Sequence, residues 1–148
     1  LNLAKEQLKE RKQQFDEQIR IGIMIEIPAI ALIADLAAEE VDFASIGSND
    51  LTQYLSAADR MNPEVAAYYK SDSTAMLRLL GFVFREFSKR EKEISVCGEM
   101  AGNPETAQLL VGLGARKLSM SSGNIAGVKA KLAECTLQEL TALAEKKL

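Results

Sequence analysis

Short apolar runs alternate with longer segments of helical periodicity along most of the chain. Four of these runs have the length and the branched residues of buried strands: Arg20–Ile25, Val41–Ile46, Glu93–Cys97 and Lys117–Met120. Each run is followed by a stretch that is long enough for a helix. This order predicts an α/β fold with four parallel strands in sequence order, joined by right-handed crossovers with the helices outside.

The predicted helices are bounded by residues that favour helix ends. Proline suits the first turn of a helix, as at Pro28 and Pro104. Asn49 or Asp50 is expected to cap a short helix after the second strand. Helices are predicted over residues 3–18, 28–38, 72–89, 124–133 and 136–147, from 104 to Gly112 or Gly114, and in a shorter piece from Asn62-Pro63.

The composition is ordinary for a globular domain, since 47% of the 148 residues are hydrophobic and 26% are charged. We expect one partial domain over residues 1–148, with a leading helix within 1–19 and a C-terminal helix within 134–148. The net charge of −3 gives nucleic acid and anionic membranes no electrostatic attraction. Glu26 and Pro28 interrupt the most apolar stretch too early for a membrane span. The chain begins with Leu1 rather than Met, so we expect a processed or excised piece.

Two residue types limit the possible chemistry. The chain has no histidine, which excludes a Ser-His-Asp triad, a Cys-His pair and any His-ligated metal site within it. A phosphohistidine would therefore have to form elsewhere. The two cysteines, Cys97 and Cys135, form neither a disulfide framework nor a zinc spacing, and a reducing, cytoplasmic compartment is expected.

Polar side chains follow each predicted strand. In a parallel sheet or barrel the carboxyl ends of the strands share one face, where ligands bind. The sequence therefore predicts that polar and reactive groups converge at this face. They are Glu26 after the first strand, Ser48, Asn49 and Asp50 after the second, Cys97 and Glu99 after the third, and Ser121 and Ser122 after the fourth.

Several of these residues have both a functional and a structural interpretation. Glu26 and Asp50 offer carboxylate oxygens that suit Mg²⁺, although Glu26 is equally explained as a solvated loop acid and Asp50 as a helix cap. Cys97 at a strand end could serve as a general acid or nucleophile, although a lone cysteine is more often a buried small apolar group. Arg60 could grip a phosphate or carboxylate with paired hydrogen bonds, and otherwise it is a surface charge.

The run of 19 residues from Asp42 to Arg60, DFASIGSNDLTQYLSAADR, is similar throughout to the signature of phosphoenolpyruvate-utilising enzymes. Gly22–Ala29 (GIMIEIPA) and Cys97–Gly102 (CGEMAG) agree with the same family in order and spacing. Together with Gly112-Leu113-Gly114 and Leu118–Ser121, the resemblance covers about residues 20–132. Within the family, the chain looks most like Enzyme I of the bacterial phosphotransferase system.

The resemblance implies that the chain is the second half of an eight-stranded (β/α)₈ barrel of the TIM type. Glu26 and Asp50 would hold Mg²⁺, which bridges to phosphoenolpyruvate. Asn49 and Arg60 would contact the substrate phosphate, and Cys97 would protonate the enolpyruvate methylene carbon as pyruvate forms. The phosphoryl group would pass to a histidine outside this chain and then to a histidine-containing phosphocarrier protein.

Two local departures from Enzyme I change the expectations. Lys70–Thr74 replaces a turn that typically contains proline and histidine, so we expect a loop contact to differ there. Asn103 stands where the family often has Asp, so the local electrostatics should differ. The first four barrel strands are also absent, and we expect the chain alone to be inactive.

Three origins stay open: Enzyme I, a pyruvate phosphate dikinase or phosphoenolpyruvate synthase fragment, and a non-catalytic half-barrel that scaffolds dimerisation. The sequence also leaves open whether the parent protein serves sugar transport or a regulatory branch. A half-barrel would expose two strand edges and the inward side chains of its strands. We expect Ile23, Ile46, Val96 and Met120 to be inward residues that lose their packing in a half-barrel. The chain should therefore self-associate, as a homodimer.

Overall fold

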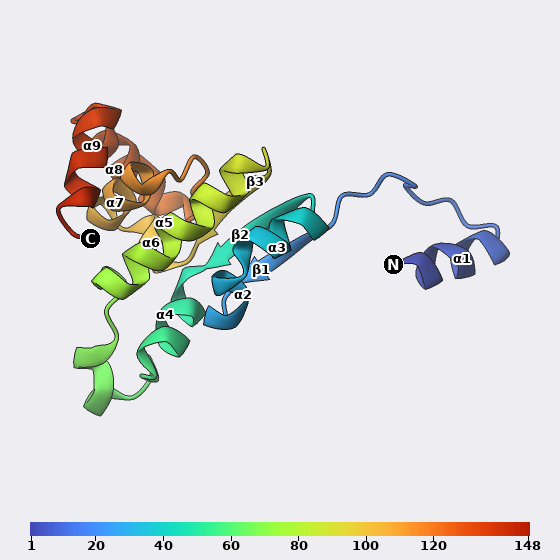
Figure 1. Ribbon diagram of the computed structural model, residues 1–148, viewed down its shortest axis with the longest axis horizontal. Coiled ribbons are helices and arrows are strands. Elements are labelled where there is room, and N and C mark those ends of the chain that lie inside the picture. Colours follow the sequence, from blue (N-terminus) through green and yellow to red (C-terminus); the bar gives the residue numbers. More distant parts are fainter.

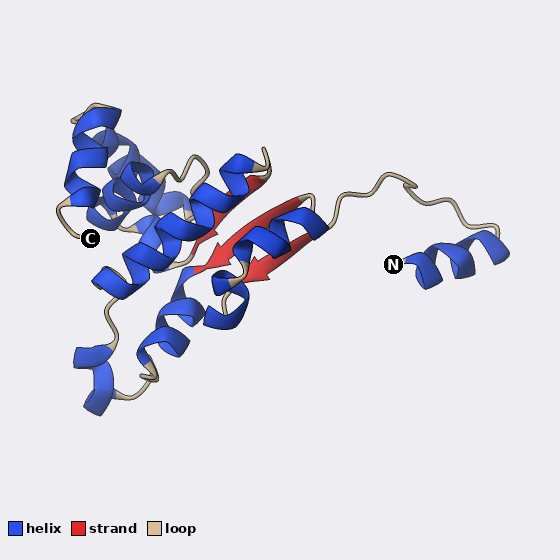
Figure 2. Ribbon diagram, in the orientation of Figure 1, coloured by secondary structure: helices blue, strands red, loops and turns tan.

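A parallel sheet of three strands organises the chain. The structure is a computed structural model that describes residues 1–148. The strands are β1 (Gly22–Ile25), β2 (Phe43–Gly47) and β3 (Glu93–Cys97), and they lie side by side in sequence order. Both neighbouring pairs are parallel. Three predicted strands and their order are therefore confirmed, with helices packed against the sheet (Figures 1 and 2).

The fourth predicted strand is reduced to a single parallel bridge between Val96 and Leu118. Two backbone hydrogen bonds hold it: Val96 N–H donates to the Lys117 carbonyl at 3.0 Å, and Ser119 N–H donates to the Val96 carbonyl at 2.8 Å. The chain turns into a helix at Ser122, so no further residue can pair. The sheet is open, and the structure shows no closed barrel.

Nine α-helices and one 3₁₀ helix accompany the sheet. They are α1 (Asn2–Glu10), α2 (Pro28–Leu32), α3 (Ala34–Glu40), α4 (Ser48–Ser56), η1 (Pro63–Tyr68), α5 (Thr74–Lys89), α6 (Glu99–Gly102), α7 (Pro104–Leu113), α8 (Ser122–Ala133) and α9 (Leu137–Glu145). None of these helices combines the length and the apolar character needed to cross a bilayer.

Several predicted helix boundaries are wrong. The leading helix ends at Glu10, because the chain turns at Lys12, whose φ is 54°. The helix predicted over 28–38 is broken at Ile33, which is not helical. The helix expected from Asn124 begins at Ser122, and the four-residue α6 was not predicted.

Other helix ends follow their sequence signals. The Asn103 side chain accepts hydrogen bonds from the Glu105 and Thr106 N–H groups, and α7 ends at Gly114 in the left-handed region with φ 118°. Thr136 and Glu139 form a capping box at the start of α9. Their local chemistry therefore fixes these ends without tertiary help.

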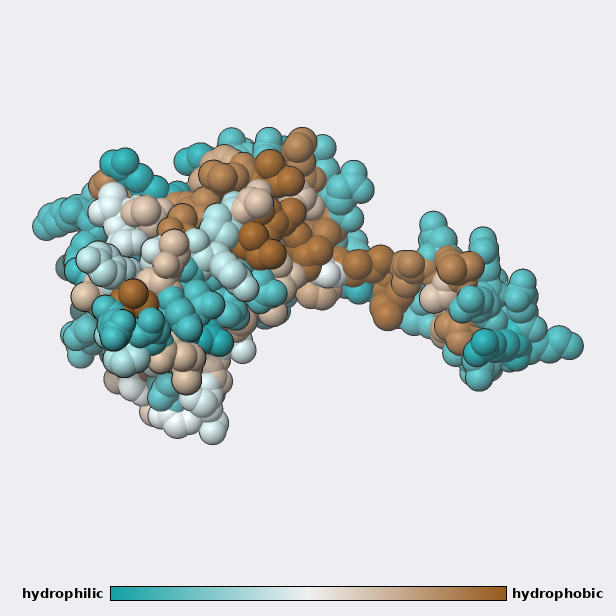
Figure 3. All heavy atoms as spheres, turned by 90° about the horizontal axis from the view of Figure 1, so that it is seen from below, coloured by the Kyte–Doolittle hydropathy of each residue, from teal (hydrophilic) through white to brown (hydrophobic).

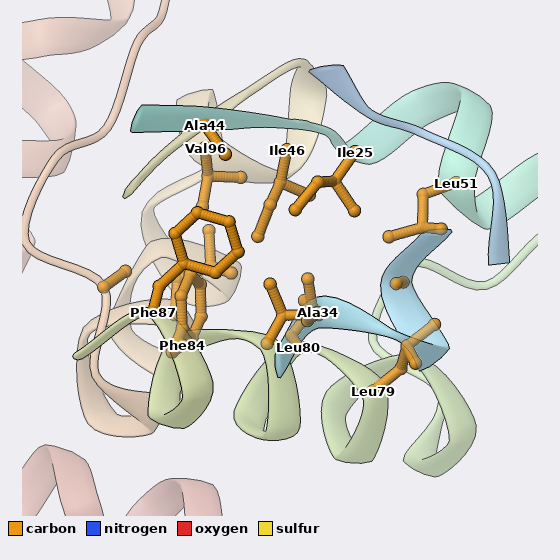
Figure 4. Close-up of a cluster of buried hydrophobic side chains, with 14 of the residues drawn as sticks. Ile25, Ala34, Ala44, Ile46, Leu51, Leu79, Leu80, Phe84, Phe87 and Val96 are labelled. Carbon is orange, nitrogen blue, oxygen red and sulfur yellow. The ribbon is translucent and has the colours of Figure 1, made fainter. Parts of the chain in front are cut away.

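The core lies between the sheet and α5. Ile25, Ile46 and Val96 are paired across the three strands in register, and each is fully buried. Figure 4 shows them pointing toward α5, where Phe84 and Phe87 face them. Burial of such side chains stabilises the fold by about 1.5–3 kcal/mol each.

Three of the four side chains that were expected to point into a barrel pack against the helices instead. Ile23, Ile46 and Val96 lie on the sheet face that contacts the helices, because side chains alternate along a strand and α5 offers the larger apolar surface. The opposite face carries Met24 and Cys97 instead, together with smaller polar side chains. Met120 lines a groove beside α8.

Two features leave apolar surface uncovered. Helix α1 contains no buried residue and projects away from the body on an extended segment (Figure 1). Figure 3 shows apolar side chains gathered on the body and along this segment. The large apolar side chains exposed around β1, α2 and α3 are Ile19, Ile21, Met24, Ile27, Leu32, Ile33 and Leu36.

Candidate functional site

A small cleft of about 170 Å³ lies at the carboxyl ends of the three strands. Four of the five predicted site residues line it, and they come from three separate stretches of sequence. The lining residues are Met24, Glu26, Gly47, Ser48, Asn49, Asp50, Cys97 and Gly98. Glu99, Ser121 and Ser122, which were also expected at this face, do not line the cleft. The convergence of Glu26, Asn49, Asp50 and Cys97 is therefore a property of the fold.

Glu26 and Asp50 bring two carboxylates to this cleft. Glu26 directly follows β1, and Asp50 lies in the first turn of α4. A side chain at position 47 would meet Glu26 Oε2 at 3.1 Å, so Gly47 leaves space for this carboxylate. No group of three or more Asp, Glu, Cys or His residues that could hold a metal ion is found in the chain. Two carboxylates are within the one or two that Mg²⁺ commonly takes from a protein, because water and substrate oxygens complete its octahedron.

The helix-cap interpretation of Asn49 and Asp50 is wrong. Gly47 occupies the N-cap position of α4, and no side chain there caps the helix. Asp50 in the first turn is still favourable for the helix, because its negative charge lies near the positive end of the helix dipole. Its side chain is free of a capping bond and can serve the cleft.

The Asn49 side chain is oriented by the first residue of α6. Its Oδ1 accepts a hydrogen bond from the Glu99 N–H at 3.0 Å. Because the oxygen is occupied in this way, Nδ2 remains as a hydrogen-bond donor beside the cleft. A donor at this position suits an anionic oxygen.

Ser48 joins the ends of β2 and β3. Its hydroxyl donates to the Cys97 carbonyl at 2.7 Å, and its own carbonyl accepts from Thr52 Oγ1 at 2.7 Å. Ser48 is only 1% exposed. Gly98 has a φ of 100°, and a side chain there would approach Ser48 Oγ to 2.5 Å. The turn after Cys97 is therefore held by a hydrogen bond from the buried Ser48, and glycine at position 98 leaves the space that the Ser48 hydroxyl needs.

Cys97 presents a half-buried, free thiol to the cleft. The thiol donates to the Ile46 carbonyl, with Sγ at 3.3 Å from the oxygen. The Ser45 hydroxyl donates toward Sγ at 3.7 Å. The sulfur is not sealed in the core, because Cys97 is only half-buried and lines the cleft.

Arg60 does not line the cleft but reaches it through Asp50. Its Nη1 lies 3.4 Å from Asp50 Oδ1, and the two side chains are 39% and 40% exposed. The pair is therefore weak and can open for a ligand, because solvent screens it. Arg60 lies in the loop after α4, and Glu26 lies in the short loop between β1 and α2.

Tyr69 belongs to the same group of residues, although no pattern in the sequence indicated it. Its hydroxyl donates to the Asn49 carbonyl at 3.1 Å. Burial raises the pKa of Tyr69, and the negative charges of Glu99 and Asp50 act in the same direction, while Arg60 lowers it. Its place after a proline-initiated helical turn gave no signal of this contact.

The two segments that depart from the Enzyme I pattern, Lys70–Thr74 and Asn103, each begin a helix. In the segment Lys70–Thr74, the Ser73 side chain accepts from the Met76 N–H and caps α5. Asn103 caps α7 through two backbone N–H groups, a role that its amide oxygen performs without charge. Both segments therefore act as helix starts.

The chain matches the family described as PEP-utilising enzyme, PEP-binding domain, over residues 1–137. It is 45% identical over 136 residues to multiphosphoryl transfer protein 2 of Escherichia coli, covering 92% of this chain and 16% of that protein. It is 42% identical over 142 residues to phosphoenolpyruvate-protein phosphotransferase of Bacillus subtilis, covering 96% of this chain and 25% of that protein. The protein of that name from Listeria monocytogenes is 43% identical over 144 residues. The chain thus spans a quarter or less of these relatives.

Proposed function

Because the chain belongs to the PEP-utilising enzymes through their PEP-binding domain, matched over residues 1–137, we propose that it is the phosphoenolpyruvate-binding part of a phosphoenolpyruvate-protein phosphotransferase. Relatives that bear this name align with nearly the whole chain. One observation carries the proposal: Glu26, Asn49, Asp50 and Cys97, which come from three separate stretches of sequence, line one cleft. These are the groups that phosphoryl transfer from an acidic three-carbon donor requires.

In this proposal the phosphate end of the substrate is bound by Asn49 and Arg60. The Asn49 amide has its oxygen occupied by Glu99, so its NH₂ group donates to a phosphate oxygen. Arg60 would exchange its weak pairing with Asp50 for the phosphate, to which a guanidinium can give two parallel hydrogen bonds. Glu26 and Asp50 would hold Mg²⁺, which supplies charge neutralisation for the phosphate and carboxylate when bound.

Cys97 is the proposed general acid. When the bond between phosphorus and the enol oxygen breaks, the phosphoryl group passes to a histidine and leaves the enolate of pyruvate. The enolate carbon then takes the thiol proton, which gives pyruvate and a thiolate that solvent reprotonates. The proposal includes a reducing, cytoplasmic location, because this step needs the free thiol.

The accepting histidine must lie outside these residues, since the chain contains none. We propose that it lies elsewhere in the longer protein and passes the phosphoryl group to a histidine-containing phosphocarrier protein. The 148-residue chain by itself should release no pyruvate from phosphoenolpyruvate. Pyruvate release above that of a Cys97→Ser control would contradict this part of the proposal.

The open sheet supports a second part of the proposal, in which the chain is half of a closed (β/α)₈ barrel. The outer edge of β1 is unpaired, and the Leu118 segment makes only one bridge. Upstream strands would pair with these edges, and exposed apolar residues around α2 and α3 would support a homodimer.

The test is Mg²⁺-dependent binding and turnover of phosphoenolpyruvate by the full-length gene product. Asp50→Ala should abolish phosphorylation from phosphoenolpyruvate, because it removes one of two carboxylates in the cleft. Glu145→Ala, an exposed carboxylate change on α9, is the matched control and should leave turnover unchanged. Near-normal turnover by Asp50→Ala would overturn the assignment.

A further inference from the structure

The segment that carries Arg60 has little packing of its own. It leaves α4 at Ala57, whose φ is 50°, and returns at Ser73, which caps α5. Ala58 is its one buried residue. Figure 1 shows the stretch around η1, in green, projecting beyond α4 and α5. Few buried contacts make such a segment prone to local opening.

Besides the backbone hydrogen bonds of Ala57 and Ala58 that end α4, two hydrogen bonds that involve side chains and one ion pair hold the segment near the cleft. The Arg60 N–H donates to Gln53 Oε1 at 3.2 Å, and the Arg60 guanidinium pairs with Asp50 at 3.4 Å. Between Met61 and Ser71, the Tyr69 hydroxyl makes the one hydrogen bond that leaves the segment, to the Asn49 carbonyl at 3.1 Å. The segment is therefore tied at both of its ends to the first two turns of α4.

We infer that Tyr69 is a positioning residue for Arg60. Its hydroxyl holds the segment 57–73 against the start of α4, so that the Arg60 guanidinium stays beside Asp50 and faces the phosphate end of the cleft. Without this hydrogen bond, the part of the segment between Met61 and Ser71 would have no hydrogen bond that leaves the segment, and Arg60 would be beside the cleft for less of the time.

The chemistry of Tyr69 suits this role. To donate to a carbonyl, the hydroxyl must keep its proton, and burial together with Glu99 and Asp50 raises its pKa. The bond also links two site elements directly, because the accepting carbonyl belongs to Asn49. Tyr68, the preceding residue, is 71% exposed and makes no side-chain hydrogen bond.

The inference rests on the proposed function, because Arg60 is taken to bind the substrate phosphate. Its first test is steady-state kinetics of the full-length gene product. Tyr69→Phe should raise KM for phosphoenolpyruvate between about threefold and tenfold, with kcat changed by less than about twofold, since one hydrogen bond that organises binding is lost. Tyr68→Phe is the matched control and should leave both constants unchanged.

A double-mutant cycle separates positioning from a general loss of structure. In an Arg60→Gln background, Tyr69→Phe should add no further increase in KM, because the group that it positions is gone. An unchanged KM in Tyr69→Phe, or the same increase with and without Arg60, would overturn the inference.

A second test does not depend on the reaction. In the 148-residue chain, amide hydrogen exchange over residues 60–70 should accelerate about threefold to tenfold in Tyr69→Phe and stay unchanged in Tyr68→Phe. Equal exchange in the two variants would show that Tyr69 does not fix the segment. If the wild-type protein turned over no phosphoenolpyruvate while exchange still accelerated, the proposed function would fail and the structural role of Tyr69 would stand.

Discussion

Replacing Gly98 by alanine tests the buried connection between β2 and β3. Gly98 has a φ of 100°, a conformation that costs other residues about 1–3 kcal/mol. An added Cβ would also lie 2.5 Å from Ser48 Oγ and 2.8 Å from Asn49 Oδ1. Moving Ser48 away would break its 2.7 Å hydrogen bond to the Cys97 carbonyl and leave a buried polar group unpaired, at about 1–3 kcal/mol. Gly98→Ala should therefore lower the free energy of unfolding by about 2–6 kcal/mol.

The measurement is urea unfolding of the 148-residue chain followed by circular dichroism. The midpoint should fall without a change in the slope, because the folded state is weakened while the exposed area is the same. Gly123→Ala is the matched control. Nothing lies within 4 Å of its added Cβ, so this variant should be as stable as the wild type or more stable by up to about 1 kcal/mol.

A double-mutant cycle identifies the source of the strain. Ser48→Ala removes the nearest oxygen, so Gly98→Ala should cost less in that background than in the wild type, by about 1 kcal/mol or more. The strained backbone would account for the remaining cost. A loss of less than about 1 kcal/mol in the free energy of unfolding of Gly98→Ala would refute the predicted strain. Additive effects of the two changes would show that the added Cβ does not clash with Ser48.

Three further outcomes are expected. The pKa of Glu86 is lowered, chiefly by a hydrogen bond from Lys89, so its contribution to stability is present at neutral pH and is lost as the pH falls through that lowered pKa. Urea midpoints measured from about pH 6 to pH 3 should fall more steeply for the wild type than for Glu86→Gln, and parallel profiles would contradict this. In the full-length gene product, Cys97→Ser should slow pyruvate formation by about 10²–10⁴-fold with little change in KM, and a loss below threefold would make Cys97 a packing residue. Light scattering should show self-association of the 148-residue chain, and a sharp monomer mass at high micromolar concentration would overturn it.

The elements that the sequence predicts well are those with strong local signals. The boundaries of β3 agree to the residue, and Asn103 and Thr136 cap the helices that follow them. The segment Lys117–Met120 was predicted as a strand, but it makes only one bridge, to Val96, before α8 begins at Ser122. A stretch of four residues carries no signal of how many backbone pairs it will form.

The strand-end members of the candidate site and Arg60 were predictable from the sequence, whereas Tyr69 was not. Glu26, Asp50 and Cys97 follow from the rule that parallel strands end on a common face. Tyr69 lies 20 residues beyond Asn49, and no periodicity connects the two. Ser48 was visible as a polar residue at a strand end, but its buried hydrogen bond depends on the register between β2 and β3.

That register also explains why a few buried side chains can fix a site that faces away from them. Ile25, Ile46 and Val96 form one fully buried row across the sheet. The residue after each of them points to the opposite face, and these residues are Glu26 just beyond β1, Gly47 and Cys97, all of which line the cleft. Since each core side chain is locked by its contact with α5, its neighbour in sequence is fixed as well. The Glu26 carboxylate, the space that Gly47 leaves beside it and the Cys97 thiol thus take their positions from the hydrophobic core.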